Sequence, residues 1–178
     1  MNLEPSVSET PLDREAILAY LREVANTLAE TGPRHTVIVV GGSLLAFHGL
    51  REATVDVDSV KRLDSELKSA VASVARLHDL APAWLNDSAS AFRPATFDEA
   101  ECEKLLVRGR LTVLGAPLRQ VFVMKLNAAR TRDYDDLVAL WRACDFETAE
   151  QAVDLYQNAY PHDADDPHLI NFVRGLAD

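Results

Sequence analysis

Apolar side chains recur at the spacing of an amphipathic α-helix in several stretches of the chain. The first stretch predicts a helix at residues 12–30. Its apolar stripe follows steps of four, three and four residues, at Ile17, Leu21, Val24 and Leu28. Further helices are expected to begin near Asp64, Pro117, Asp133, Thr148 and Pro167.

Two other stretches have the composition of β-strands. Residues 36–40 form a β-branched run that is too short for such a helix, and they predict a buried strand. A short helix is expected at residues 43–49. At residues 54–60, valine and aspartate alternate with a period of two, which places Asp56 and Asp58 on the same face of a second strand.

The middle of the chain contains one irregular region and one hairpin. Residues 81–100 lack a clear pattern, which predicts either a functional loop or a short unrecognised element. Residues 104–114 have apolar positions on both sides of Gly109 and predict a β-hairpin. The mixture of strands and helices predicts the α+β class, with a small mixed β-sheet flanked by helices.

Composition and charge narrow the choice of partners. Of the 178 residues, 48% are hydrophobic and 26% are charged, which is an ordinary globular balance. The formal net charge of −10 argues against general DNA binding, because such binding depends on Lys and Arg side chains that neutralise phosphates. A nucleotide, a structured RNA end or another protein is the expected partner.

The sequence shows no sign of membrane insertion or export. No apolar run approaches the ~20 residues that span a bilayer, and residues 1–10 lack the order of a signal peptide. We therefore expect a cytoplasmic protein with no membrane partner. Cys102 and Cys144 have neither disulfide-framework nor zinc-site spacing, so both are expected to be thiols in apolar surroundings.

The strand that ends at Val40 runs directly into Gly41, Gly42 and Ser43. Two glycines allow a sharp turn and let a phosphate approach without a Cβ in its way. Ser43 would then begin a helix, where free N–H groups and its hydroxyl can receive an anion. Taken alone, the segment is better explained as a tight strand-to-helix turn with Ser43 as the N-cap.

Asp56 and Asp58 change that interpretation. Aspartate is a poor strand former, so two of them among valines require an explanation. Carboxylates two residues apart on one strand face can share a hard cation such as Mg2+. The alternative is an exposed acidic strand face. Arg51 and Thr54 lead into the pair, which gives the order R-x-x-T-x-D-x-D after G-G-S.

This order of residues resembles the nucleotidyltransferase superfamily typified by polymerase-beta-like enzymes. The pattern of that superfamily is a glycine-serine turn followed, after a short spacing, by D-x-D. The text from Gly41 to Asp58 is most similar to that of AbiEii-like and MenT-like toxins and of related nucleotidyltransferase-like proteins of unassigned function.

A second block extends the resemblance. The run M-K-L-N-A-A-R contains Lys125, and R-D-Y-D-D-L begins at Arg132. They look like the K-L-x-A-x-R and R-D-x-x-D-L of the AbiEii-like group, in which the lysine and a downstream aspartate belong to the active site. On a continuous helix Lys125, Arg132 and Asp136 would face the same way, whereas a break would leave Asp133 and Asp136 as alternatives. The competing interpretation is a snorkelling lysine beside a surface Arg–Asp pair.

The resemblance also implies a domain organisation. Residues 1–11 are expected to be a disordered lead-in, residues 12–115 a nucleotidyltransferase-like core, and residues 116–178 a helical C-terminal part packed on it. Classical members carry a third metal-binding carboxylate on a later strand, and the predicted hairpin offers none. Substitutes just before the hairpin, which depend on a favourable register, are Glu99, Glu101 and Glu103.

Two functions follow from these residues. The first is a Mg2+-dependent nucleotidyltransferase that moves a nucleoside monophosphate from a nucleoside triphosphate to a tRNA end or a protein acceptor. The resemblance implies a toxin–antitoxin component with a cognate antitoxin as a partner. The second is a degenerate module of the same fold that binds nucleotide or a protein without turnover, which the missing third carboxylate favours.

The expected site residues divide into two groups. Those expected to bind nucleotide phosphates are Gly41, Gly42, Ser43, Arg51, Thr54 and Arg132. The expected catalytic residues are Asp56 and Asp58, which would also hold Mg2+, together with Lys125 and Asp136, and with Asp133 as a secondary candidate.

Overall fold

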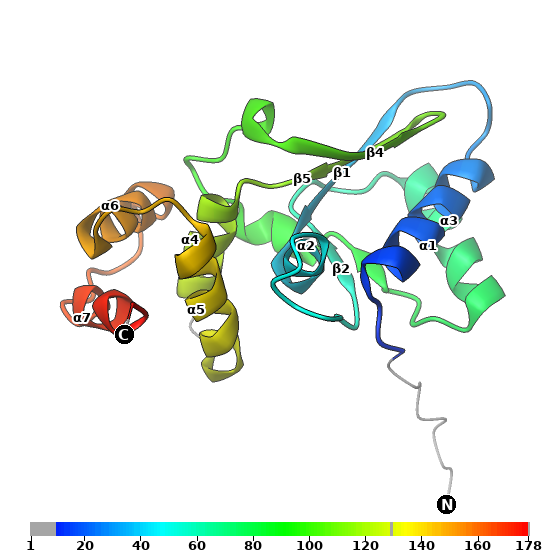
Figure 1. Ribbon diagram of the computed structural model, residues 1–178. Helices are drawn as coiled ribbons and strands as arrows, with labels where there is room; N and C mark the ends of the chain where they lie inside the picture. Colours follow the sequence, from blue (N-terminus) through cyan, green and yellow to red (C-terminus); the bar gives the residue numbers. More distant parts are fainter. Residues whose placement is uncertain (1–9, 129, 178) are drawn as a thin grey trace, which may run out of the picture.

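A computed structural model describes residues 10–128 and 130–177, which form a mixed five-stranded sheet and surrounding helices (Figure 1). The predicted α+β class is confirmed. The strands are β1 His35–Val40, β2 Val57–Ser59, β3 Leu85–Asn86, β4 Glu103–Arg108 and β5 Leu111–Gly115. The α-helices are α1 Arg14–Thr27, α2 Gly41–Phe47, α3 Ser65–His78, α4 Leu118–Ala128, α5 Tyr134–Ala143, α6 Ala149–Ala159 and α7 Leu169–Gly175. Short 3-10 helices are η1 Ser88–Phe92, η2 Glu99–Glu101 and η3 Thr131–Asp133. Residues 1–9 of the predicted lead-in lie outside the described residues.

The strand order is β3–β2–β1–β5–β4, so β1 lies at the centre of the sheet. β1 pairs parallel with β5 and antiparallel with β2, while β2 pairs parallel with β3. β4 and β5 form the predicted hairpin, and Gly109 in its turn has a φ of +53°. Strand β1 is buried along most of its length, as its β-branched composition predicts.

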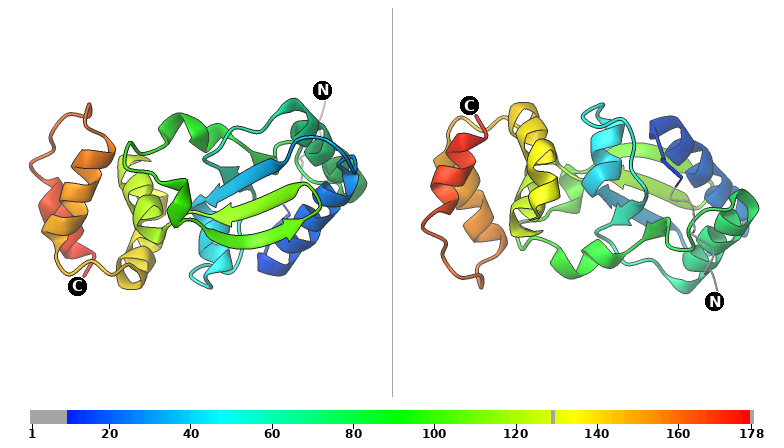
Figure 2. Two further views of the ribbon diagram at one scale, coloured as in Figure 1. Left: turned by 90° about the horizontal axis from the view of Figure 1, so that it is seen from above. Right: turned by 90° about the horizontal axis from the view of Figure 1, so that it is seen from below.

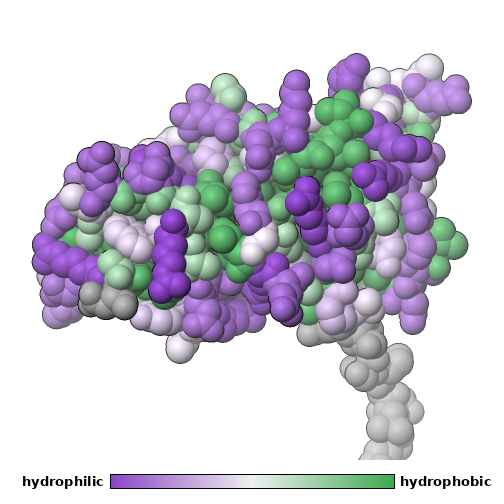
Figure 3. All heavy atoms as spheres, viewed as in Figure 1, coloured by the Kyte–Doolittle hydropathy of each residue, from purple (hydrophilic) through white to green (hydrophobic). Residues whose placement is uncertain are grey.

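Helices α1, α2 and α3 lie on one side of the sheet, and Figure 2 shows β1, β5 and β4 uncovered on the other side. Helices α4 to α7 gather at the end of the sheet opposite α1 and α3 (Figure 1). Hydrophilic side chains cover most of the face seen in Figure 3, in keeping with the charge of the chain. Among the described residues, no helix has the length and apolar character needed to cross a membrane.

Two helix starts follow the predicted capping residues. Asp64 is the N-cap of α3, where its carboxylate accepts a hydrogen bond of 3.0 Å from the Leu67 N–H. Thr148 is the N-cap of α6, and its hydroxyl accepts one of 3.3 Å from the Gln151 N–H. Both predictions are confirmed. Each capping signal depends only on residues close together in the sequence, so the sequence alone is enough to identify it.

Helix α1 is shorter than predicted at both ends. It begins at Arg14, because Leu12 forms an isolated antiparallel bridge with Thr54 and Asp13 caps the helix through the Ala16 N–H. At the other end, the chain leaves helical geometry after Thr27. The bridge attaches the start of the described chain to the segment that precedes β2.

The irregular residues 81–100 contain short elements rather than one loop. Strand β3 and the 3-10 helices η1 and η2 fall in or next to this stretch, so the alternative of an unrecognised element is correct. Strand β3 extends the sheet beyond β2 and lies parallel to it.

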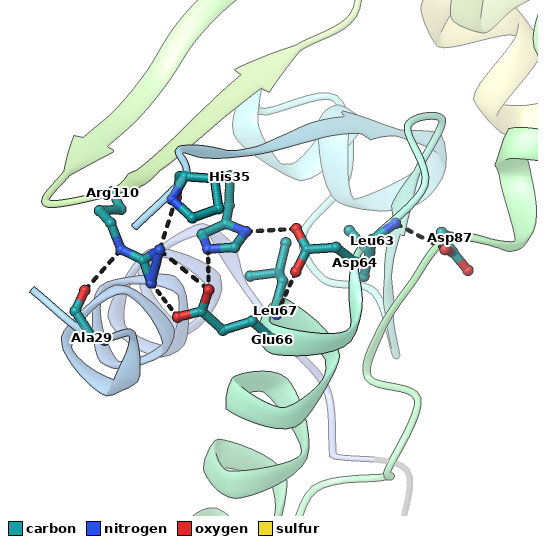
Figure 4. A network of polar contacts seen from close by, with 9 residues as sticks. Ala29, His35, Leu63, Asp64, Glu66, Leu67, Asp87 and Arg110 are labelled. Atoms are coloured by element: carbon teal, nitrogen blue, oxygen red, sulfur yellow. Dashed lines mark hydrogen bonds and ion pairs between the residues drawn. The ribbon is translucent and has the colours of Figure 1, made fainter. Parts of the chain in front are cut away.

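A polar network fixes the start of β1, at the end opposite the glycine turn (Figure 4). The buried His35 ring lies 2.6 Å from Asp64 Oδ2 through Nδ1 and 3.0 Å from Glu66 Oε2 through Nε2. Arg110, from the hairpin, pairs with Glu66 and donates to two backbone carbonyls between α1 and β1. Burial acts to raise the pKa of Asp64, but hydrogen bonds from an α3 backbone N–H and from His35 hold it below its usual range. The network thereby joins α1, β1, α3 and the hairpin.

Candidate active site

The turn between β1 and α2 is approached closely by side chains from three other positions. Gly41 has a φ of +64°, which favours glycine, and a Cβ there would lie 3.2 Å from Asp58 Oδ2. A Cβ at Gly42 would lie 3.0 Å from both Arg51 Nη1 and Thr54 Oγ1. The missing side chains therefore allow Asp58, Arg51 and Thr54 to reach the turn.

The helix after the turn starts earlier than predicted. Helix α2 begins at Gly41, and its N-cap, Val40, makes no side-chain capping bond. Ser43 is buried, and its hydroxyl donates to the Val40 carbonyl at 2.9 Å. The N-cap prediction for Ser43 is therefore wrong, because Val40 takes that position, while its predicted contact with a phosphate stays a prediction. The first-turn N–H groups, which lack partners within a helix, are the donors that remain for an anion.

Asp56 and Asp58 are placed on a shorter strand than predicted. Strand β2 covers only Val57–Ser59, so Asp58 lies within it, opposite the last residue of β1, and Asp56 directly precedes it. The strand does not extend back to Thr54, because that residue pairs with Leu12 instead. Asp58 nevertheless lies beside the glycine turn, and Asp56 lies directly before the strand that carries Asp58.

The two carboxylates influence each other electrostatically. Burial is the main reason that the pKa of Asp58 is raised above its usual value, and the negative charge of Asp56 raises it further. The polar Asn86 amide and the charges of Arg130 and Lys125 lower this pKa by smaller amounts. A cation shared by the carboxylates would offset their repulsion, so the donor set fits a hard cation such as Mg2+. Within the described chain, no group of three His, Cys, Asp or Glu side chains is placed to hold a metal.

Asn86 is a residue of this region that the sequence pattern did not reveal. Strands β2 and β3 pair in parallel, and Asn86 lies opposite Asp58. Strand β3 has only two residues, so no periodicity marks it in the sequence. The strand that pairs with the outer side of β2 is therefore β3. The predicted hairpin, where a third carboxylate would be expected from the resemblance, does not pair with β2.

The three glutamates before the hairpin are occupied elsewhere or exposed. Glu99 pairs with Lys61 at 3.0 Å. Glu103 is the first residue of β4, and its Oε1 lies 2.8 Å from His48 Nε2. Glu101 is exposed. None of these contacts involves Asp58, so they do not supply the third carboxylate.

Lys125 lies in a buried cluster of ion pairs. Its Nζ is 2.8 Å from Asp133 Oδ1 and 2.9 Å from Asp136 Oδ2. The side chains of Lys125 and Asp133 are 10% exposed, and that of Asp136 is 12% exposed. The lysine therefore does not snorkel to solvent, which rules out the competing interpretation.

A break in the helix brings both aspartates to the lysine. Helix α4 ends at Ala128, and the 3-10 helix η3 turns the chain before α5 begins. Asp133 lies at the end of η3 and Asp136 in the first turn of α5, and both reach Lys125. The continuous helix that would have aligned Arg132 with Lys125 is therefore absent, and Arg132 is exposed.

Arg51 connects the glycine turn to the lysine cluster. Its Nη1, which lies against Gly42, is also 3.1 Å from Asp136 Oδ2. Asp136 thus accepts from Arg51 and from Lys125 at once. Through Arg51, the Lys125 cluster therefore reaches the glycine turn, which Asp58 also approaches.

A small cavity opens beside Asp56. Its volume is about 190 Å3, and its mostly apolar walls include Leu12, Leu80 and Trp84. Ligand pockets usually enclose about 300–1,000 Å3, so this cavity is too small for a whole nucleotide.

A mixed sheet whose central strand ends in a glycine turn, with aspartates on the next strand and a buried lysine nearby, defines the class of nucleotidyltransferase-like proteins. The family model described as "Nucleotidyltransferase of unknown function (DUF6036)" matches residues 16–169. The chain therefore belongs to this family, and the family implies a nucleotide substrate. Comparisons with curated proteins and with solved structures gave no match. The predicted superfamily is confirmed, while the closer likeness to AbiEii-like and MenT-like toxins stays a prediction.

Proposed function

We propose that the chain is a Mg2+-dependent enzyme that moves a nucleoside monophosphate from a nucleoside triphosphate to an RNA end or a protein side chain. The observation that carries the proposal is the convergence of Asp58, Arg51 and the Lys125 cluster on the glycine turn. Membership of the nucleotidyltransferase family supports a nucleotide as the donor.

The β- and γ-phosphates would bind at the glycine turn. The first-turn N–H groups of α2 donate to anions, and Gly41 and Gly42 let the backbone approach them. Arg51 is held against the turn with 44% of its side chain exposed, so its guanidinium is available to a phosphate. Thr54 Oγ1 lies beside it, and the exposed Arg132 is a further cation for the triphosphate.

Asp56 and Asp58 would hold Mg2+. Two carboxylates that repel each other suit one divalent cation, whose other ligands come from phosphate oxygens and water. When bound, the ion neutralises charge on the triphosphate and stabilises the leaving pyrophosphate. The chain itself positions Asp58 through the pairing of β2 with β1.

The transfer forms a bond between an acceptor hydroxyl oxygen and the α-phosphorus, and it breaks the bond from that phosphorus to the oxygen bridging to the β-phosphate. Pyrophosphate leaves, and the hydroxyl proton passes to a carboxylate or to water. Lys125, which Asp133 and Asp136 hold in place, neutralises the charge that builds on the transferred phosphate. Asp136 accepts from two cations, which favours an orienting role for it over that of a general base.

The resemblance to AbiEii-like and MenT-like toxins supports a tRNA end as acceptor, a toxin role and a cognate antitoxin as partner. The net charge of −10 disfavours binding along a nucleic acid, but a single RNA end requires only local cations. Arg51, Arg130 and Arg132 are exposed and provide such cations near the site.

Nucleotide binding without turnover is the second candidate function. It is favoured by the uncharged Asn86, which lies opposite Asp58 on the neighbouring strand where a third carboxylate would complete a conventional centre. A domain of this kind would bind nucleotide or a protein partner and leave the phosphates intact.

Radiolabel transfer separates the two functions. The protein is incubated with each nucleoside triphosphate labelled at the α-phosphate, with Mg2+, and with total tRNA or a cell extract. We expect label on RNA or protein, lost in Asp56→Ala and retained in Asp165→Asn, which changes an exposed aspartate away from the site. Nucleotide binding without label on any acceptor would leave only the binding module, and the absence of both would exclude the proposed enzyme.

A further inference from the structure

Two aromatic side chains form an exposed corner at the helical end of the molecule. Tyr134 and Phe172 leave 45% and 42% of their surfaces exposed. Their ring centroids lie 6.3 Å apart, and the ring planes meet at 71°. Tyr134 is the first residue of α5, and Phe172 lies within α7. The aromatic corner is therefore built by two segments that are distant in the sequence.

Neither helix depends on the aromatic corner for its attachment to the core. Helix α5 buries Leu137 and Leu140, which are 4% and 0% exposed. Helix α7 buries Val173, and Leu176 directly after it is 2% exposed. Exposed aromatic side chains that do not anchor the fold are typical of surfaces that bind a partner, because a ring offers a large, rigid contact area.

The aromatic corner lies next to the candidate active site. Tyr134 directly follows Asp133, whose Oδ1 is 2.8 Å from Lys125 Nζ, and consecutive Cα atoms are only about 3.8 Å apart. Two residues further on, Asp136 contacts both Lys125 and Arg51. The same turn of chain thus directs two carboxylates to the lysine and exposes an aromatic ring beside them.

The exposed charge next to the aromatic corner is positive, unlike that of the chain as a whole. Residues 130–135 expose Arg130 and Arg132, whereas their only exposed carboxylate is that of Asp135. A single-stranded nucleic acid carries a phosphate beside each base, so it can use such arginines and a ring together. A protein acceptor has no comparable alternation of anionic and planar groups. The combination therefore favours an RNA strand as the occupant.

We infer that Tyr134 and Phe172 form a stacking site for an unpaired base at the end of an acceptor RNA, with Arg130 and Arg132 contacting its phosphates. Bases within a duplex are already stacked on their neighbours, so the site takes a single-stranded end. This inference rests on the proposed function, because it selects between the two acceptor classes of the same site. It adds the residues that hold the acceptor.

The test measures binding of a short, fluorescein-labelled oligoadenylate to the full chain by fluorescence anisotropy. Tyr134→Leu keeps an apolar side chain but removes the ring, so it should bind the strand about tenfold more weakly, equivalent to ~1.4 kcal/mol. Tyr134→Phe keeps the ring and should retain the wild-type affinity. The control is Leu77→Ala, which changes an apolar side chain that is 74% exposed on α3, at the opposite end of the sheet, and should bind normally (Figure 1).

A second probe separates stacking from attraction between charges. An abasic strand of the same length has the same phosphates without bases, so it should bind wild type and Tyr134→Leu with equal, weaker affinity. The inference would be overturned if wild type bound both strands equally, or if Tyr134→Leu bound oligoadenylate as wild type does. Circular dichroism checks the folding of each variant, and the two-strand comparison on wild type decides the inference even if Tyr134→Leu fails to fold.

Two further measurements keep this inference apart from the proposed function. Calorimetry with ATP and Mg2+ should give equal affinities for wild type and Tyr134→Leu, and a loss confined to ATP would assign the ring to the donor base and overturn the inference. Label transfer from a nucleoside triphosphate to any acceptor, with no role for the ring in oligoadenylate binding, would leave the enzyme in place without the stacking site. Ring-dependent oligoadenylate binding without any label transfer would sustain the stacking site and exclude the enzyme.

Discussion

Replacing Lys125 with methionine removes the cation that Asp133 and Asp136 share, and it keeps a side chain of similar length. At an effective dielectric constant of ~20, charges ~3 Å apart attract by about 5–6 kcal/mol before the cost of desolvation. All three side chains are at most 12% exposed, so the two carboxylates would stay buried after the change. Removing one partner of a buried ion pair destabilises proteins by about 3–5 kcal/mol. We expect Lys125→Met to lose stability within that range.

The remaining cation near the cluster cannot fully replace the lysine. Of the two aspartates, Arg51 pairs with Asp136, and 44% of its side chain is exposed, so solvent screens its charge. The double variant Lys125→Met/Asp133→Asn removes one negative charge together with the positive one and leaves the pair of Arg51 with Asp136. It should therefore be more stable than the sum of the single changes predicts, with a coupling energy of about 1–3 kcal/mol.

Urea unfolding followed by tryptophan fluorescence measures these differences, since Trp84 is buried and Trp141 packs against the core. The matched control is Lys68→Met, because Lys68 makes an ion pair with Asp87 at 3.3 Å while 57% of its side chain is exposed. That change should cost at most about 1 kcal/mol. A loss in Lys125→Met no larger than in the control, or no coupling in the double variant, would refute the buried cluster as described.

Three further predictions address the turn, the polar network and a thiol. Gly42→Ala places a Cβ 3.0 Å from both Arg51 Nη1 and Thr54 Oγ1, which must then shift. Calorimetry should show nucleotide binding about tenfold weaker, equivalent to ~1.4 kcal/mol, and unchanged affinity would contradict a phosphate site there. The pKa of Asp64 is lower in the folded state than in the unfolded state. Its ionised carboxylate therefore contributes to the free energy of unfolding above the unfolded-state pKa of about 3.9, and this contribution is lost as pH falls through the folded-state pKa. Wild type should therefore exceed Asp64→Asn in denaturant stability by at most about 1 kcal/mol near pH 6 and by less near pH 3, and an advantage that grows on acidification would reverse the assigned sign. Partial burial raises the pKa of Cys144 to about 12, so this thiol should react with iodoacetamide at pH 8 far more slowly than free cysteine, and equal rates would contradict the raised pKa.

The parts of the fold that were predicted correctly depend on short-range signals. Asp64 and Thr148 cap helices through backbone N–H groups three residues away, and the hairpin turns at Gly109 between two short apolar runs. Such features are encoded within a few residues, so one sequence is enough to identify them.

The parts that were missed depend on contacts between distant segments. Arg51 and Asp136 meet although 85 residues separate them, and no local pattern encodes that contact. Asn86 lies on a two-residue strand, whose existence depends on pairing with β2 rather than on its own composition. The resemblance to the AbiEii-like group, together with residue spacing, predicted Lys125 and both aspartates as candidates, but the break after α4 that joins them required the structure.

The contact of Asp136 with Arg51 crosses the predicted boundary between residues 12–115 and residues 116–178, whereas its contact with Lys125 lies within the second part. A chain synthesised from its N-terminus produces the glycine turn and both β2 aspartates well before α5 emerges. Until then, Arg51 lacks its carboxylate partner on α5. Lys125, once synthesised, likewise lacks its partners Asp133 and Asp136. The candidate site therefore assembles only when most of the polypeptide has left the ribosome, so a prematurely truncated product would carry the recognisable motif without the contacts that α5 makes with it.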